Sequence, residues 1–148
     1  MKNSISHLMK ALSIWAVLGV STLTAQVADK IVANIPFDFT VLDKHFSAGT
    51  YTFRSDTLQS PIRIQGGKDD AAMFVLASSA QAPKIQEEAK LVFHRYGDQY
   101  FLSKIWYPGT DQGRELRVSK AEQVVARNMS KPEETTLLAG SKQRKPIR

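Results

Sequence analysis

The stretch LVFHRYGDQYFLSKIW, Leu91 to Trp106, decides the fold of this chain. Two runs of residues that favour β-strands flank Gly97-Asp98, and a glycine leading a two-residue turn is typical of a tight hairpin. Such a turn also fixes the register of the two strands. The predicted cross-strand pairs are Tyr96 with Gln99, Arg95 with Tyr100, His94 with Phe101, and Phe93 with Leu102.

Both faces of this hairpin are apolar. Side chains two positions apart along a strand point to the same face. One face is predicted to carry Leu91, Phe93, Leu102 and Trp106, and the other Val92, His94, Phe101, Ile105 and Tyr107. We expect the first face to meet the core and the second to meet a helix, because two apolar faces need two packing partners.

A short C-terminal helix is predicted to begin at Ser119. The segment SKAE matches a capping box, in which Ser119 caps the third amide and Glu122 reaches back to the first. Apolar residues follow at helical spacing until Lys131-Pro132 ends the helix. A helix of about ten residues is not stable alone in water, so we expect it to cover the sheet, with Val124 and Val125 buried.

The rest of the chain is predicted to form short strands joined by turns. KIVANIPFDFTVL, residues 30–42, alternates apolar and polar positions, which predicts a strand with one buried face and a break or bulge at Pro36. AAMFVLAS, residues 71–78, is apolar at both parities, which predicts a central strand covered on both sides. Residues 78–88 are predicted to form the longest loop. We therefore expect a mainly antiparallel β fold, a small barrel or sandwich of about six or seven strands with one C-terminal α-helix.

Residues 1–25 match a secretory signal peptide. Lys2 and Lys10 flank a polar start, ALSIWAVLGV forms a short apolar run, and STLTA ends it with small residues, which predicts cleavage between Ala25 and Gln26. The mature chain is therefore expected to be exported, either to the periplasm or out of the cell. An uncleaved anchor is the alternative, but a helix that spans a bilayer needs roughly 20 apolar residues. No later segment approaches that length.

Positive charge is concentrated at the ends of the sequence. The mature chain is predicted to hold one β domain with its helix at residues 26–130 and a basic disordered tail at residues 131–148. The formal net charge is +6, yet residues 26–140 contain fourteen basic and fourteen acidic groups. Because nucleic-acid-binding domains concentrate positive charge on the folded surface, we expect no nucleic-acid partner. Weak contact with an anionic surface is predicted for the tail, through Lys142, Arg144, Lys145 and Arg148.

The residue types present exclude several kinds of site. Cysteine is absent, which excludes disulfides, thiol catalysis and thiolate metal sites. Asp38, Asp43 and His45 are candidate metal ligands by type, but their spacing matches no known metal site. We therefore expect no metal and no cofactor.

His94 is the most attractive candidate for catalysis. Arg95 cannot converge with it on one substrate atom, because adjacent residues of a strand point to opposite faces. Asp98 lies in the turn, and a general base needs an orienting partner within hydrogen-bond reach. No such carboxylate is evident, so His94 is interpreted as structural and no catalytic residue is predicted.

Five segments of the sequence, NIPFDF, SAGTYTF, KLVFHRYGDQYFLSKIW, GREL and SKAE, occur in the same order in one group of bacterial proteins. Over residues 30–127 the chain resembles the small exported proteins of unknown function that are common in Acidobacteria. The common form of the second motif has Leu-Pro before Ala-Gly-Thr-Tyr. Phe46-Ser47 stands there in this chain, so that turn is expected to be less rigid. The resemblance implies export and supplies no catalytic residues.

The predicted function is that of an exported, non-enzymatic β domain, either a binding module or a structural module associated with the cell envelope. The alternatives are a small β-barrel carrying an apolar ligand and, third, a hydrolase. Large inward-facing aromatic residues would fill a small barrel and leave no room for a ligand. Recognition is therefore predicted on the outer surface, at Tyr96 and Tyr107 with His94 and Arg95 nearby, and at the loop of residues 78–88. The expected partner is an envelope or extracellular protein or polymer.

Overall fold

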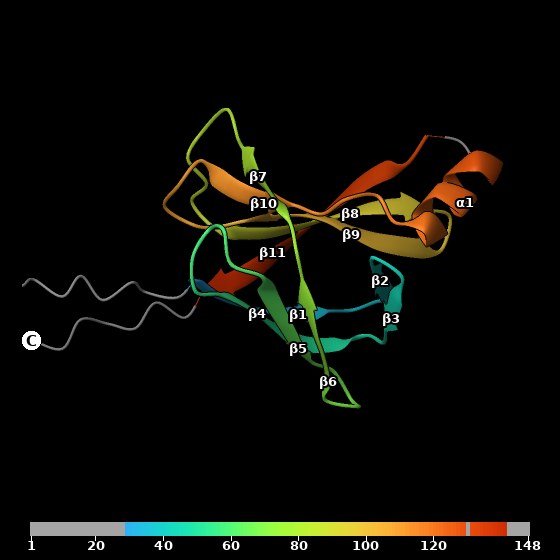
Figure 1. Cartoon of the computed structure of the whole chain (residues 1–148), viewed down its shortest axis with the longest axis horizontal. Helices are drawn as coiled ribbons and strands as arrows, with labels where there is room; N and C mark the ends of the chain where they lie inside the picture. The colour runs from blue at the N-terminus through green and yellow to red at the C-terminus, as the bar shows by residue number, and fades with distance from the viewer. Residues whose placement is uncertain (1–28, 130, 142–148) are drawn as a thin grey trace, which may run out of the picture.

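A computed structural model describes residues 29–129 and 131–141 (Figure 1). Eleven strands and one helix follow one another along this part of the chain. The elements are β1 (Asp29–Ile35), β2 (Phe39–Val41), β3 (Lys44–Phe46), β4 (Gly49–Ser55), β5 (Ile62–Gly66), β6 (Ala71–Val75), β7 (Ser78–Gln81), β8 (Ala89–Tyr96), β9 (Gln99–Trp106), β10 (Gln112–Glu115), α1 (Lys120–Asn128) and β11 (Glu133–Ser141).

All strands belong to one curved sheet. Its main path runs β3-β2-β9-β8-β11-β1-β4-β5-β6, and β10 pairs with both β7 and β9. The neighbours are antiparallel except β2 and β9, which run parallel where Thr40 meets Phe101. The prediction of a mainly β fold with one helix is confirmed. The predicted number of about six or seven strands is wrong, and the sheet is mixed.

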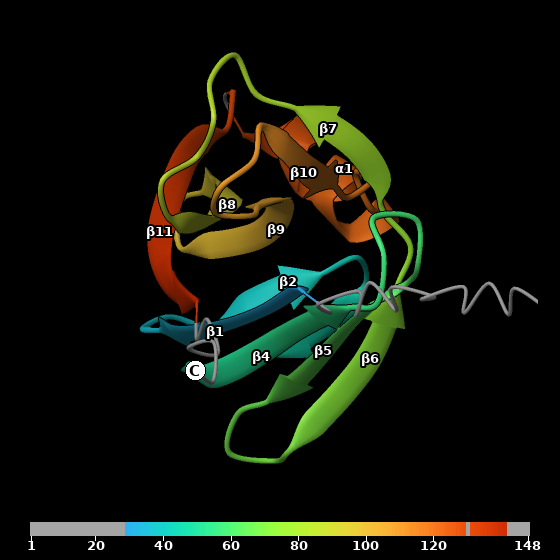
Figure 2. The same ribbon diagram turned by 90° about the vertical axis from the view of Figure 1, so that its left-hand side faces the viewer.

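The sheet curls into a nearly closed barrel, as seen end-on in Figure 2. β11 pairs with β8 along most of its length and with β1 at its end, so it joins the two layers on one side. On the opposite side, β6 pairs with β5 while β7, only two residues further on, pairs with β10. The two ends of the main path also approach each other, because the ammonium of Lys44 on β3 donates to the carbonyl of Ala72 on β6 at 3.1 Å.

Alternation of apolar and polar residues places one face of most strands inside the barrel. β1 ends at Ile35, and the predicted break at Pro36 separates it from β2. The interior is filled with large side chains, among them Ile31, Ile35, Phe39, Phe46, Tyr51, Phe53, Ile62, Ile64, Leu91, Phe93 and Ile105. Aromatic rings meet there edge to face, with 5.0 Å between the centroids of Phe39 and Tyr51 and 5.7 Å between those of Phe39 and Phe93. Such contacts favour a well-packed interior.

The β8–β9 hairpin has the predicted register, including all four cross-strand pairs next to the turn. Beyond them a β-bulge intervenes, because Phe93 pairs with Leu102 whereas Val92 pairs with Lys104, which leaves Ser103 as an extra residue. The bulge reverses the alternation, so Ile105 and Tyr107 belong to the core and the prediction that they share the helix-facing side of the hairpin is wrong. Trp106, predicted to share the inward face, is half-buried and pairs with Gly113 on β10, where its ring occupies the space that a Cβ on that glycine would need.

Helix α1 is capped as predicted, but it is docked differently. Ser119 Oγ accepts a hydrogen bond from the Glu122 amide at 3.1 Å. Val124 is 57% exposed and Val125 is half-buried, whereas the Glu122 side chain is buried. The prediction that the two valines dock the helix is therefore wrong.

Three further predictions are corrected. Residues 131–148 were expected to form a disordered tail, yet Glu133–Ser141 form β11 in the middle of the sheet. β6 was expected to be covered on both faces, yet Phe74 is 69% exposed and lies on the terminal strand of the main path. Part of the predicted loop at residues 78–88 is strand β7.

The signal peptide predicted at residues 1–25 and the basic residues Lys142, Arg144, Lys145 and Arg148 lie outside the described residues. Among the residues that the structure describes, no helix has the length and apolar character needed to cross a membrane.

Candidate functional site

Two of the predicted site residues, His94 and Tyr96, belong to a buried polar network beneath helix α1. Nδ1 of His94 lies 2.6 Å from Oε1 of Glu122, and the Tyr96 hydroxyl donates to the same oxygen at 3.3 Å. On the other side of the imidazole, Ser103 Oγ lies 3.1 Å from Nε2. The bulge in β9 brings Ser103 to this face of the hairpin. The network therefore joins β8, β9 and α1.

Burial raises the pKa of Tyr96 above its ordinary value, and the neighbouring charge of Glu122 and their hydrogen bond raise it further. The phenol thus keeps its proton and donates a hydrogen bond to the carboxylate. A buried carboxylate is tolerated only where donors satisfy it, and Tyr96 and His94 are such donors for Glu122.

The contacts run serine, histidine, carboxylate, which is the order of a nucleophile, its base and the orienting acid. Access is the difficulty for such chemistry. Ser103 is 4% exposed and Glu122 is 4% exposed, so no substrate carbonyl reaches the serine oxygen while α1 is docked. What the network does in this arrangement is fasten the helix to the hairpin.

The hypothesis that no carboxylate orients His94 is therefore wrong. Glu122 occupies that position, although it is 28 residues away in sequence. The capping-box pattern assigned its side chain to the start of the helix, where only the Ser119 half of the interaction is present. Placing Glu122 correctly requires knowing that α1 lies over β8.

The predicted recognition surface does not assemble. Tyr96 and Tyr107 are only 5% and 3% exposed, so neither is presented to a partner, and Tyr107 packs in the core. Arg95 is half-buried, stacks over the ring of Tyr100 at 5.6 Å and donates to the carbonyl of Gly97 at 2.8 Å.

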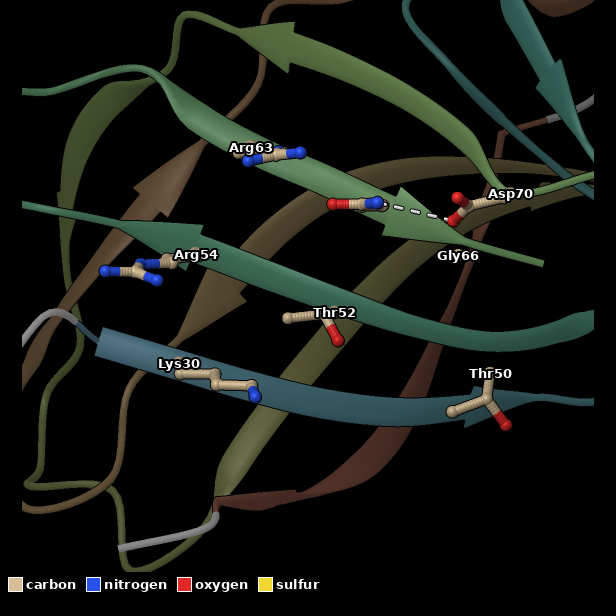
Figure 3. Close-up of a pocket in the computed structure, with 8 residues that line it drawn as sticks. Lys30, Thr50, Thr52, Arg54, Arg63, Gly66 and Asp70 are labelled. Carbon is tan, nitrogen blue, oxygen red and sulfur yellow. Dashed lines mark hydrogen bonds between the residues drawn. The ribbon is translucent and has the colours of Figure 1, made fainter. Parts of the chain in front are cut away.

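A second group of polar residues lies on the outer face of β1, β4 and β5. Lys30 pairs directly with Arg54, and Arg54 pairs directly with Arg63. All three side chains are exposed. Figure 3 shows them on three adjacent strands. We call these three residues the cationic row.

The cationic row borders two adjoining hollows. The first has a volume of about 390 Å³, and the second about 360 Å³. Arg54 and Arg63 line both of them. The first is also lined by Lys30, Thr50, Thr52, Gln65, Gly66 and Asp70, and the second by Asp56, Pro61 and Phe74.

Two carboxylates, Asp56 and Asp70, also line these hollows, so the lining keeps a net charge of +1. The carboxylate of Asp56 lies 3.8 Å from Nε of Arg54, with both side chains largely exposed, and Asp70 accepts a hydrogen bond from Gln65 at 3.3 Å. Like charges placed directly opposite each other on neighbouring strands are destabilising. The row therefore creates a locally positive surface whose repulsion a bound anion would relieve.

Sequence patterns identify part of this surface. Arg54 and Arg63 alternate with buried residues, so each is recognisable as outward-facing. Their convergence with Lys30 depends on the strand order β1-β4-β5 and on the register, which alternation does not supply.

The candidate metal ligands do not converge. The imidazole of His45 lies 3.7 Å from the Asp38 carboxylate, both exposed, while Asp43 accepts a hydrogen bond from the Ala121 amide at 3.3 Å. Within residues 29–129 and 131–141, no group of three or more metal-ligating side chains is present.

No protein-family model, curated protein or solved structure matches this sequence.

Proposed function

We propose that this protein is an exported, non-enzymatic β domain that binds an anionic polymer of the cell envelope or its surroundings. The observation that carries the proposal is the cationic row, in which Lys30, Arg54 and Arg63 stand directly opposite one another on three neighbouring strands. Export is inferred from the signal-peptide pattern of residues 1–25.

The chemistry of the row suits carboxylate, sulfate or phosphate groups. Two of its three members are arginines, whose planar guanidinium forms paired hydrogen bonds with such anions. Hydroxyl groups of Thr50 and Thr52 lie beside them and offer further hydrogen bonds to a ligand.

The supporting surface is well suited to holding these groups in place. Each cation projects from the middle or end of a strand whose opposite face is packed in the barrel, with Ile31, Phe53 and Ile64 buried beneath. A rigid backbone lowers the entropy lost on binding, which improves affinity. Contacts with several charges also give binding that weakens as salt rises.

The proposal is tested with the double variant Arg54→Gln/Arg63→Gln. A matched control is Arg117→Gln/Arg127→Gln, which removes the same charge from exposed positions before and within α1. Affinity for a polyanion such as polygalacturonate is measured by calorimetry at two salt concentrations. We expect the affinity of the first variant for the polyanion to fall about tenfold or more, because hydrogen bonds to charged groups contribute about 1.5–3 kcal/mol each.

The affinity of the control variant is expected to fall much less, and its binding should keep the salt dependence of the parent. Equal losses in the two variants would mean that only overall charge matters, and the cationic row would not be the site. Circular dichroism of each variant establishes that the fold is kept.

A further inference from the structure

The cationic row continues into an aromatic side chain. Arg63 on β5 pairs directly with Phe74 on β6, so Phe74 stands next in line on the same face. The guanidinium of Arg63 lies 5.9 Å from the centre of the Phe74 ring. Phe74 is 69% exposed and lines the second hollow together with both arginines.

Across the sheet from β1 to β6, the side chains along this line are therefore three cations followed by one aromatic ring. With neighbouring strands ~4.8 Å apart, the line extends over ~14 Å across the strands. A linear ligand lying across the sheet would meet every member in turn. What distinguishes Phe74 from other exposed apolar side chains is its position beside the charged groups of the row.

The ligand must then offer both negative charge and an apolar ring face. Polyphosphate and poly-glutamate provide the charge alone. An acidic polysaccharide provides carboxylate or sulfate groups and also sugar rings, whose C–H faces pack against aromatic side chains. The hollow beside the row contributes the hydroxyls of Thr50 and Thr52 and the amide of Gln65, which match the hydroxyl groups of sugars.

Single-stranded nucleic acid also combines charge with rings, but it is recognised by several aromatic side chains on which successive bases stack. The two hollows that border the row contain one aromatic residue, Phe74. We propose that the ligand is an acidic polysaccharide, bound across β1, β4, β5 and β6 with its acidic groups on the cationic row and one sugar ring on Phe74. This inference rests on the proposed function and specifies its ligand.

The experiment compares four probes of similar length at matched ionic strength: polygalacturonate, poly-glutamate, neutral dextran and single-stranded DNA. Binding is measured by calorimetry for the parent, Phe74→Ala and Leu76→Ala. Leu76 is a matched control because it is also an exposed apolar residue, at 73%, two positions further along.

We expect the parent to prefer polygalacturonate over poly-glutamate by about tenfold, as one aromatic contact allows. Phe74→Ala should abolish this preference by weakening polygalacturonate binding about tenfold more than poly-glutamate binding, and Leu76→Ala should alter neither affinity. Dextran should not bind measurably.

Equal affinity for both carboxylate polymers would overturn the inference but leave the proposed function intact. Tighter binding of DNA than of polygalacturonate would also overturn it and identify nucleic acid as the ligand. Failure of every anionic probe to bind would instead reject the proposed function itself.

Discussion

Glu122 is a carboxylate placed where burial would normally exclude one, at 4% exposure beneath the first turn of α1. Its position is tolerated because His94 and Tyr96 surround one of its oxygens. The imidazole is in turn held by Ser103 on its other nitrogen. Each member of the network is thus fixed by a residue from another element, which makes the network a structural fastening of high specificity.

Tyr96 gives this network a pH dependence on the alkaline side. Because its pKa is raised in the folded protein, the unfolded chain loses the phenolic proton first as pH increases through about 10. The contribution of Tyr96 to stability is therefore complete below that pH and declines above it. Urea unfolding between pH 8 and 11 should show a steeper loss in the parent than in Tyr96→Phe. Identical slopes would contradict the assignment.

Arg114 fastens another part of the barrel from within. It is 1% exposed, and its guanidinium donates to the carbonyls of Leu58 and Ala77. These carbonyls belong to the β4–β5 loop and to the joint between β6 and β7, so one side chain ties both to β10. A cation at this depth is stabilised by such hydrogen bonds.

We expect Arg114→Lys to destabilise the fold by about 2–3 kcal/mol, because an ammonium does not reproduce the two-pronged geometry and leaves a carbonyl without its donor. Chemical denaturation measures the effect. The exposed Arg117→Lys is the control and should change stability by less than about 0.5 kcal/mol. If Arg114→Lys were as stable as the parent, the hydrogen bonds from Arg114 to the carbonyls of Leu58 and Ala77 would not be required for stability.

At the scale of elements, α1 is attached by polar contacts and by few apolar ones. Glu122→Ala should therefore cost about 2–4 kcal/mol, since it leaves buried donors unsatisfied. Val124→Ala, two residues away and 57% exposed, should cost less than about 0.5 kcal/mol. The two variants are compared by thermal and urea unfolding. A larger loss for Val124→Ala would show that the helix packs through its apolar stripe after all.

Strand β11 is the element on which closure of the sheet depends most. It lies between β8 and β1 and pairs with both. Truncation after residue 132 removes it and leaves two unpaired edges, so we expect loss of cooperative unfolding. Truncation after residue 141 retains every described strand pair and should leave the fold intact. Amide NMR spectra distinguish the outcomes, and a well-dispersed spectrum for the shorter chain would contradict this role of β11.

For the molecule as a whole, sequence patterns predict local structure well and long-range neighbours poorly. The hairpin at Gly97-Asp98 was predictable because its register depends on a two-residue turn. The bulge at Ser103 was not, since an extra residue in a strand leaves no mark in composition. β11 was missed because EETTLLAGS has little alternation and is preceded by a proline, which suggested a tail.

The charge distribution shows the same difference between what sequence composition predicts and what depends on long-range neighbours. Residues 26–140 carry equal numbers of acidic and basic groups, and this balance argued against a nucleic-acid partner. Folding separates the groups, however, and gathers Lys30, Arg54 and Arg63 on one face. Only the strand order makes that face apparent.

The most direct test of the central claim, that the cationic row is a binding site for anionic polymers, is a titration of labelled protein with polygalacturonate oligomers followed by amide NMR. The largest shift changes are expected at Lys30, Arg54 and Arg63 and at their strand neighbours, decreasing with added salt. Amides around Arg117 and Arg127 should change little. Shifts centred on α1, or none on β1, β4 and β5 under conditions where binding is measured, would contradict the claim.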